Sequence, residues 1–164
     1  MSEPDYLMAI ATVTENLAFL MPVGPAEEPA GESAEDWFCQ VQVYWVGPDG
    51  SRGRIVVALD RGCAQATAAN LLGMAPGEVP GDPEIYEACN ELANVIAGNL
   101  LPVRYGHDHE FHLHPPTVVP IAPLAGRVVV RLALMEGLIG VAIDGDADNS
   151  RILRAVQLPP GFGA

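Results

Sequence analysis

Residues 82–102 read DPEIYEACNELANVIAGNLLP and carry the clearest helical pattern in the chain. Asp82 predicts an N-cap and Pro83 a first-turn proline, and we expect Pro102 to end the helix after Leu101. The apolar residues that recur on one stripe are Ile85, Ala88, Cys89, Leu92, Ala93, Ile96 and Leu100. This stripe predicts the helix face that packs against a sheet.

The opposite side of this helix carries a narrow column of four residues, Glu87, Glu91, Asn94 and Gly98, which we call the exposed column. A solvated helix face needs polar residues, and this ordinary explanation accounts for the two glutamates. It does not account for Asn94 or Gly98, because asparagine costs up to about half a kcal/mol and glycine about 1 kcal/mol against better helix formers. A glycine also leaves the helix surface bare for the close approach of a partner.

The rest of the sequence predicts an α+β fold. Helices are expected over residues 5–21 and 61–72, and strands over residues 37–46, 54–59, 109–119, 127–135 and 138–144. The turn GPDG at residues 47–50 joins the first two strands into a hairpin. This order predicts an antiparallel sheet with helices packed on one face.

The length of 164 residues matches one domain, which we expect to span residues 1–156. Residues 22–36, rich in proline, glycine and acid, predict a flexible connector inside it, and residues 157–164 predict a disordered tail. The first and third helices end in the similar strings FLMP and NLLP. This echo suggests two pseudo-symmetric halves.

The charge composition excludes several functions. The formal net charge is −13, and all 8 basic residues are arginines. Nucleic acid and anionic membranes are therefore unexpected partners, because both are bound through clustered basic residues. The absence of lysine also excludes a P-loop ammonium, a Schiff base and a lysine general base.

The three cysteines, Cys39, Cys63 and Cys89, have neither disulfide-framework nor zinc-ligand spacing, so three reduced thiols are expected. The N-terminal residues are acidic, and no apolar run approaches the length of a membrane span. We expect a cytoplasmic protein.

Three segments resemble the CheC/CheX/FliY family of chemotaxis phosphatases. They are EACNELANVIAGNLLP at residues 87–102, TENLAFLMP at 14–22 and PPTVV at 115–119. The family's signature is a Glu, two residues and an Asn on a helix, which Glu91 and Asn94 match. The Ala-Gly-Asn run at residues 97–99 is typical of the CheX branch.

This resemblance implies a phosphatase that hydrolyses the phospho-aspartate of a receiver domain in a response regulator. Asn94 would orient the attacking water, Glu91 would pair with the receiver's active-site lysine, and Glu87 and Gly98 would contact the partner. The protein would need no cofactor of its own, because the receiver supplies Mg²⁺. The resemblance also implies a homodimer.

The chain departs from the family pattern at two positions. Glu87 stands where Asp or Ser is typical, and Pro116 lies one position short of the expected proline, which Thr117 replaces. These departures favour an alternative function, a receiver-binding adaptor or sensor that does not catalyse. In the first helix Glu15 is followed at the third position by Ala18 and not Asn, so we expect one site per chain.

Two other clusters could bind metals. His107, His109, His112 and His114 share a short segment with two carboxylates, but ligands on one flat strand seldom complete a tetrahedron. We expect a solvated or pH-responsive strand there and no metal. The aspartates of residues 144–149 lack the glutamate that completes an EF-hand loop, so a polar turn is expected instead.

Overall fold

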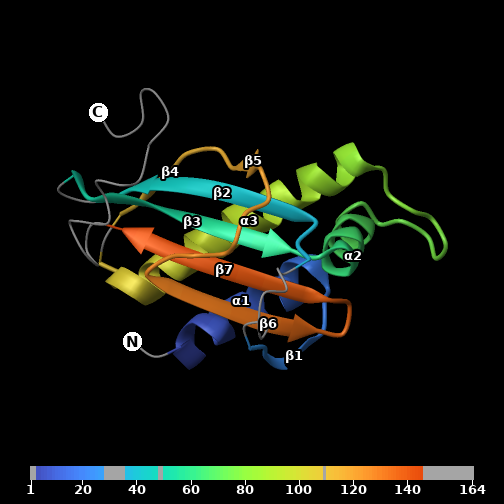
Figure 1. The fold of residues 1–164 in the computed structure, drawn as a ribbon, viewed down its shortest axis with the longest axis horizontal. Coiled ribbons are helices and arrows are strands. Elements are labelled where there is room, and N and C mark those ends of the chain that lie inside the picture. Colours follow the sequence, from blue (N-terminus) through green and yellow to red (C-terminus); the bar gives the residue numbers. More distant parts are fainter. Residues whose placement is uncertain (1–2, 28–35, 48–49, 109, 146–164) are drawn as a thin grey trace.

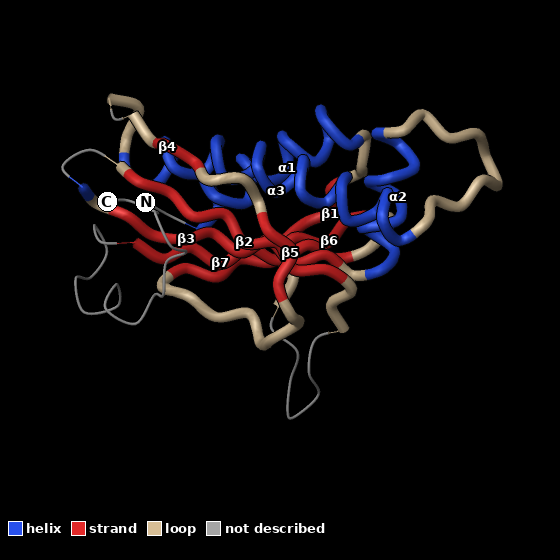
Figure 2. Tube along the Cα trace, turned by 90° about the horizontal axis from the view of Figure 1, so that it is seen from above, coloured by secondary structure: helices blue, strands red, loops and turns tan. Residues whose placement is uncertain are grey.

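The structure is a computed structural model that describes residues 3–27, 36–47, 50–108 and 110–145. Within these ranges an antiparallel sheet carries the helices α1 (Glu3–Ala18), α2 (Arg61–Leu71) and α3 (Asp82–Tyr105) on one face (Figures 1 and 2). The predicted fold class is confirmed. The predicted domain limits and the tail at residues 157–164 extend beyond the described residues.

Among the described residues the sheet contains seven strands, β1 (Pro22–Pro25), β2 (Cys39–Val46), β3 (Arg52–Leu59), β4 (His112–Leu113), β5 (Thr117–Val119), β6 (Val128–Leu134) and β7 (Leu138–Gly145). Their order is β1-β6-β7-β3-β2-β4, and β5 also pairs with β2. The β2–β3 and β6–β7 hairpins meet at the β3–β7 pair. The short strand β1 pairs with β6 of the second hairpin, and the short strand β5 pairs with β2 of the first hairpin. The pseudo-symmetry of the two halves stays a prediction.

The main core lies between the sheet and the helices. Val41, Val43 and Trp45 of β2 and Ile55 and Val57 of β3 are fully buried there. These residues alternate along their strands, so the predicted hairpin places one apolar row against α3. No helix in the described residues is long and apolar enough to cross a membrane.

The first helix ends at Ala18 and not at Met21 as predicted. Phe19 takes a left-handed backbone conformation with φ 54°, and the N–H of Leu20 donates to the carbonyl of Thr14 at 3.1 Å. A residue in the left-handed conformation ends the last helical turn here, at a position that a glycine usually takes. The apolar residues in the sequence continue past the end of the helix, because the side chain of Leu20 is buried in the core although its backbone is no longer helical.

The prediction of a flexible connector over residues 22–36 is wrong at its start. Residues Pro22–Pro25 form β1, which pairs with β6 at the edge of the sheet. Proline is tolerated there because an edge strand needs hydrogen bonds on one side only. Residues 28–35 of this segment lie outside the described residues.

The third helix is longer than predicted. Gly81, and not Asp82, is the N-cap, and its N–H donates to Glu84 Oε2 at 2.9 Å. Pro102 lies inside the helix, which runs to Tyr105 and has Gly106, with φ 97°, as its C-cap. A proline removes the hydrogen bond to the carbonyl four residues earlier, here Gly98, but the following residues can continue the helix.

The single strand predicted over residues 109–119 is two short strands. Pro115 and Pro116 separate β4 from β5, and both strands pair with β2. Two consecutive prolines cannot donate to a strand ladder, so the chain leaves the sheet between the two pairings.

Candidate functional site

The exposed column lies on the outer side of α3, which packs against α1, α2 and the sheet. The predicted stripe is buried, together with Ala97 and Leu101. All four column residues, Glu87, Glu91, Asn94 and Gly98, are exposed. The helical spacing therefore predicted both faces of α3, while the chemical roles of the column stay predictions.

The carboxylate of Glu91 and the carboxamide of Asn94 stand one turn apart on this exposed side. Neither side chain has a hydrogen-bond or ion-pair partner within the part of the chain that the structure describes. An asparagine side chain offers one acceptor oxygen and two donor hydrogens. Both groups are thus available to a molecule that binds against α3.

Gly98 continues the column and leaves it bare one turn after Asn94. A Cβ atom built on Gly98 meets only Cδ1 of Leu113, at 3.9 Å, which is an ordinary contact. Leu113 belongs to β4, so this short strand lies beside the C-terminal half of the column. The site is therefore an open helix surface with a strand along one side.

The family's expected proline position falls on β5. Thr117 is exposed at the first position of this strand and pairs with Gln42 of β2. Pro116 comes immediately before β5 and is half-buried. Because β5 packs against α3, this departure from the family pattern lies close to the helix that carries the column.

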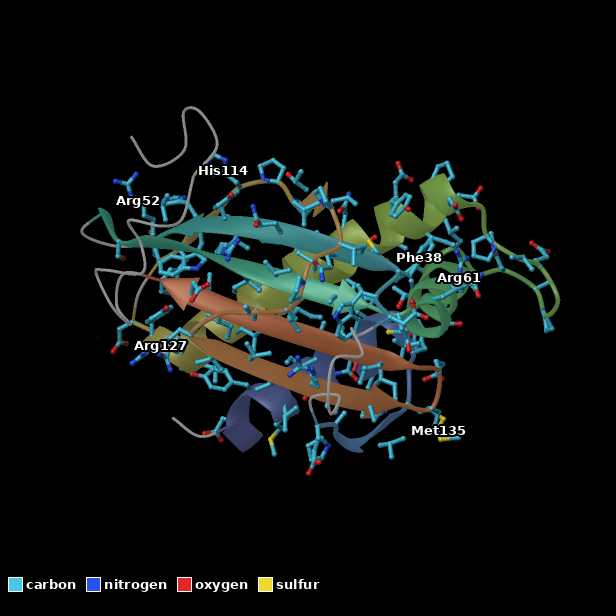
Figure 3. The ribbon with its side chains drawn as sticks, viewed as in Figure 1. Phe38, Arg52, Arg61, His114, Arg127 and Met135 are labelled. Atoms are coloured by element: carbon cyan, nitrogen blue, oxygen red, sulfur yellow. The ribbon has the colours of Figure 1, made fainter. Side chains whose placement is uncertain are left out.

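Side chains at both ends of α3 fix the direction of the helix. At its start the Tyr86 ring stacks on Phe38 with centroids 5.7 Å apart and an interplanar angle of 2°. The guanidinium of Arg61 lies 4.2 Å from the centre of the Phe38 ring (Figure 3). At its end Arg104 Nη1 donates to the hydroxyl of the buried Tyr6 on α1 at 2.8 Å. The column is thus displayed on a rigid element.

The electrostatics of α3 suit a cationic partner group. Glu84, Glu87 and Glu91 are exposed, and the sequence of the helix contains no basic residue before Arg104. The guanidinium of Arg104 is engaged with Tyr6. With the exposed Asp82, the three glutamates make four carboxylates on this helix before its first basic residue, which favours a positively charged group on a partner.

The predicted metal clusters differ in what the structure describes of them. His107 and His112 are exposed, His114 is half-buried, and His109 lies outside the described residues. No three His, Cys, Asp or Glu residues that could hold a metal ion come together in the described ranges. Asp144 is buried within β7, inside the strand predicted over residues 138–144. Residues 146–149, where the polar turn was predicted, lie outside the described ranges.

The three cysteines are free and buried, and their spacing in the sequence did not predict any contact between them. Cys39 of β2 and Cys89 of α3 share a hydrogen bond, which raises the pKa of Cys89 together with burial and lowers that of Cys39. Burial and the Asp60 carboxylate raise the pKa of Cys63 to about 12. These thiols belong to the core under α3 and not to the exposed column.

One polar residue beside the column was not among the predicted site residues. Asn90 lies on α3 one turn before Asn94, and its Oδ1 is buried without a hydrogen-bond partner among the described residues. The helical pattern placed Asn90 on neither the apolar stripe nor the column. The only sequence signal was its spacing of four residues from Asn94.

Similar folds occur in solved structures of chemotaxis proteins. A CheX from Vibrio vulnificus is 18% identical, with 87% of this chain and 95% of that chain covered and a TM-score of 0.63. A CheC-like protein from Shewanella oneidensis is 18% identical, with 87% and 96% covered and a TM-score of 0.60. The CheX in a CheX–CheY–BeF₃–Mg²⁺ complex from Borrelia burgdorferi is 21% identical, with 86% and 96% covered and a TM-score of 0.60.

These low identities show the fold alone, and a search of curated proteins found no match. A family model described as chemotaxis phosphatase CheX matches residues 46–132, which is more than half of the chain. This range contains α3 and the complete exposed column. The chain therefore belongs to the chemotaxis phosphatase CheX family.

Proposed function

We propose that this protein hydrolyses the phospho-aspartate of a receiver domain, with Asn94 as the residue that positions the attacking water. The observation that carries the proposal is the exposed carboxamide of Asn94, which has no hydrogen-bond partner among the described residues and lies one turn from the carboxylate of Glu91. Membership of a chemotaxis phosphatase family supports it.

The chemistry asks little of this chain beyond positioning. Water attacks the phosphorus in line, the new P–O bond forms as the bond to the aspartyl oxygen breaks, and the products are inorganic phosphate and a free carboxylate. The Asn94 oxygen can accept a hydrogen bond from the water and hold it on the line of attack. Placing a reactant in the reactive geometry supplies a large part of the barrier reduction in such transfers.

In this proposal the cations come from the partner. The chain has no lysine, and α3 presents carboxylates. Glu91 would pair with the lysine of the receiver's active site, while Glu87 and Gly98 would contact the surface around it. Mg²⁺ would be held by the receiver and not by this chain.

We further propose a CheY-like response regulator as the partner. The relative from B. burgdorferi was solved in complex with CheY, BeF₃ and Mg²⁺, and its fold is similar to that of this chain. The homodimer implied by the resemblance stays a prediction.

The test measures phosphate release from receiver proteins phosphorylated by a small-molecule donor with Mg²⁺. Asn94→Ala should lower the stimulated rate by about 100-fold while leaving the fold and binding intact, because the residue is exposed and acts by positioning. Asn99→Ala is a matched control, since Asn99 is an exposed asparagine on the same helix that donates to the Val95 carbonyl and lies off the column. Full activity of Asn94→Ala would refute the mechanism.

The second candidate is a receiver-binding adaptor or sensor of the same fold. Two observations favour it, the glutamate at position 87 and the exposed Thr117 where the family pattern expects a proline. This function predicts that a phosphorylated receiver binds but that neither the native chain nor Asn94→Ala accelerates phosphate release. Binding and hydrolysis measured on the same samples separate the two functions.

A further inference from the structure

The outer face of the sheet, away from the helices, differs in charge from the rest of the protein. The described strands contain a single carboxylate, Asp144, and three arginines, Arg52, Arg54 and Arg131, in a chain whose net charge is −13. Arg54 alternates with the core residue Ile55 and pairs across the sheet with Tyr44 and Asp144. Its side chain therefore stands on the outer face.

A segment of residues 120–127, which we call the strap, crosses this face (Figure 2). At one end the Gln40 side chain donates to the Ala122 carbonyl at 2.6 Å and accepts the Ala122 N–H at 3.3 Å. At the other end the Arg127 N–H donates to Asp144 Oδ1 at 2.7 Å. Between them Leu124 is buried in a small cluster with Trp37, Val56, Ala58 and Ala142. The strap is thus fixed at both ends and in the middle.

A cavity of about 220 Å³ lies between the strap and strands β2 and β3. Gln40, Gln42, Arg54 and Val56 line it from the sheet, and residues 119–120 and 122–125 line it from the other side. A second, more open hollow of about 360 Å³ contains Arg127 and Asp144 and shares Arg54 and Ala125 with the first. Arg54 therefore lies where the two spaces meet.

The guanidinium of Arg54 has unused donors. Nη1 donates to Gln42 Oε1 at 3.2 Å. Nε is buried and has no hydrogen-bond partner among the described residues. It forms an ion pair with Asp144 Oδ2 at 3.7 Å, a distance too long for a hydrogen bond. A guanidinium carries five N–H donors in a rigid fork that matches carboxylate and phosphate oxygens. The cavity wall thus holds a positioned fork that Gln42 satisfies only in part.

We propose that this cavity binds a small organic anion whose carboxylate or phosphate is held by Arg54. The apolar body of the ligand lies against Val56 and Leu124, and Arg127 adds a second positive charge at the open side. Arg54 and Arg127 carry two positive charges and Asp144 carries one negative charge, so the site has a net charge of one positive unit. Because the site is on the sheet face opposite α3, it can be occupied while the exposed column contacts another protein.

The test titrates the full chain with probes that vary the head group and the apolar body separately. Benzoate and phenyl phosphate carry the two candidate heads on one ring, benzyl alcohol is the uncharged counterpart, and inorganic phosphate is the head without a body. Benzoate or phenyl phosphate should bind by calorimetry and raise the thermal midpoint. Which of the two binds more tightly identifies the head group, and benzyl alcohol and phosphate should bind at least about tenfold more weakly.

Arg54→Gln should weaken binding of the preferred probe by about tenfold or more, because a charge-assisted hydrogen bond is lost. Arg52→Gln is the matched control, since Arg52 lies on the same strand but does not line the cavity, and it should change the affinity less than about threefold. In the native chain the Arg54 Nε–H resonance should shift on titration, which does not depend on a folded variant. Equal loss in both variants, or no binding by either aromatic anion, would overturn the proposal.

Discussion

Replacing Gly98 with alanine should make the fold more stable and the interaction with the receiver weaker. The backbone of Gly98 is helical, and an added Cβ meets only Leu113 Cδ1, at 3.9 Å. Alanine is favoured over glycine inside a helix by about 1 kcal/mol. For a chain of this size that gain corresponds to a rise of about 2–4 °C in the thermal midpoint.

The same methyl group projects from the exposed column one turn after Asn94. If a receiver packs closely against the bare helix surface, the added methyl group pushes the receiver away from the helix. Overpacking of this kind costs about 1–3 kcal/mol. That cost is a loss of about 5- to 150-fold in affinity. Thermal unfolding and receiver dephosphorylation, measured on the same preparation, should therefore change in opposite directions.

Asn99→Ala provides the matched control for Gly98→Ala. Asn99 is the next residue on the helix, is exposed and lies off the column, so its replacement should leave dephosphorylation unchanged. A Gly98→Ala protein that is stabilised but fully active would refute the close approach of a partner at this position. A destabilised Gly98→Ala protein would refute the packing argument itself.

Three further predictions concern charge and stability. Glu91→Gln should weaken receiver binding about tenfold, or about 1.4 kcal/mol, and reduce its salt dependence, as titrations at two salt concentrations would show; unchanged affinity would count against the lysine pair. Burial raises the pKa of Cys63 from 9.0 and that of Tyr105 from 10.0, each to about 12. The unfolded chain loses these protons at a lower pH than the folded chain does. The urea midpoint of unfolding should therefore stay constant below pH 9 and fall as the pH rises toward 12, and a midpoint that does not change with pH would contradict this. Asp60 accepts the N–H groups of Cys63 at 2.9 Å and Leu138 at 3.0 Å, so Asp60→Ala should cost about 2 kcal/mol in urea unfolding, and Asp60→Asn, which keeps one acceptor oxygen, should recover about half; equal losses in both would exclude these bonds as the cause.

Local patterns were sufficient for much of the fold. The period of α3 predicted which residues are buried and that Glu91 and Asn94 stand together on the exposed side, because a helix repeats every 3.6 residues whatever it packs against. The alternation in β2 likewise predicted the hairpin and its buried row. Predictions failed where an end depends on backbone geometry, as at Phe19, or on a proline such as Pro102 that the helix tolerates.

The long-range arrangement required the tertiary structure. Neither the pairing of β1 with β6 nor that of β5 with β2 has a local signature, since the partners are far apart in sequence. The same holds for Cys39 beside Cys89. The sequence alone determined the faces of α3 and the chemistry displayed on them, because side-chain direction within a helix is a local property. Only the assembled sheet decided that Arg54 stands beneath the strap, because strand register and loop packing depend on residues from the whole chain.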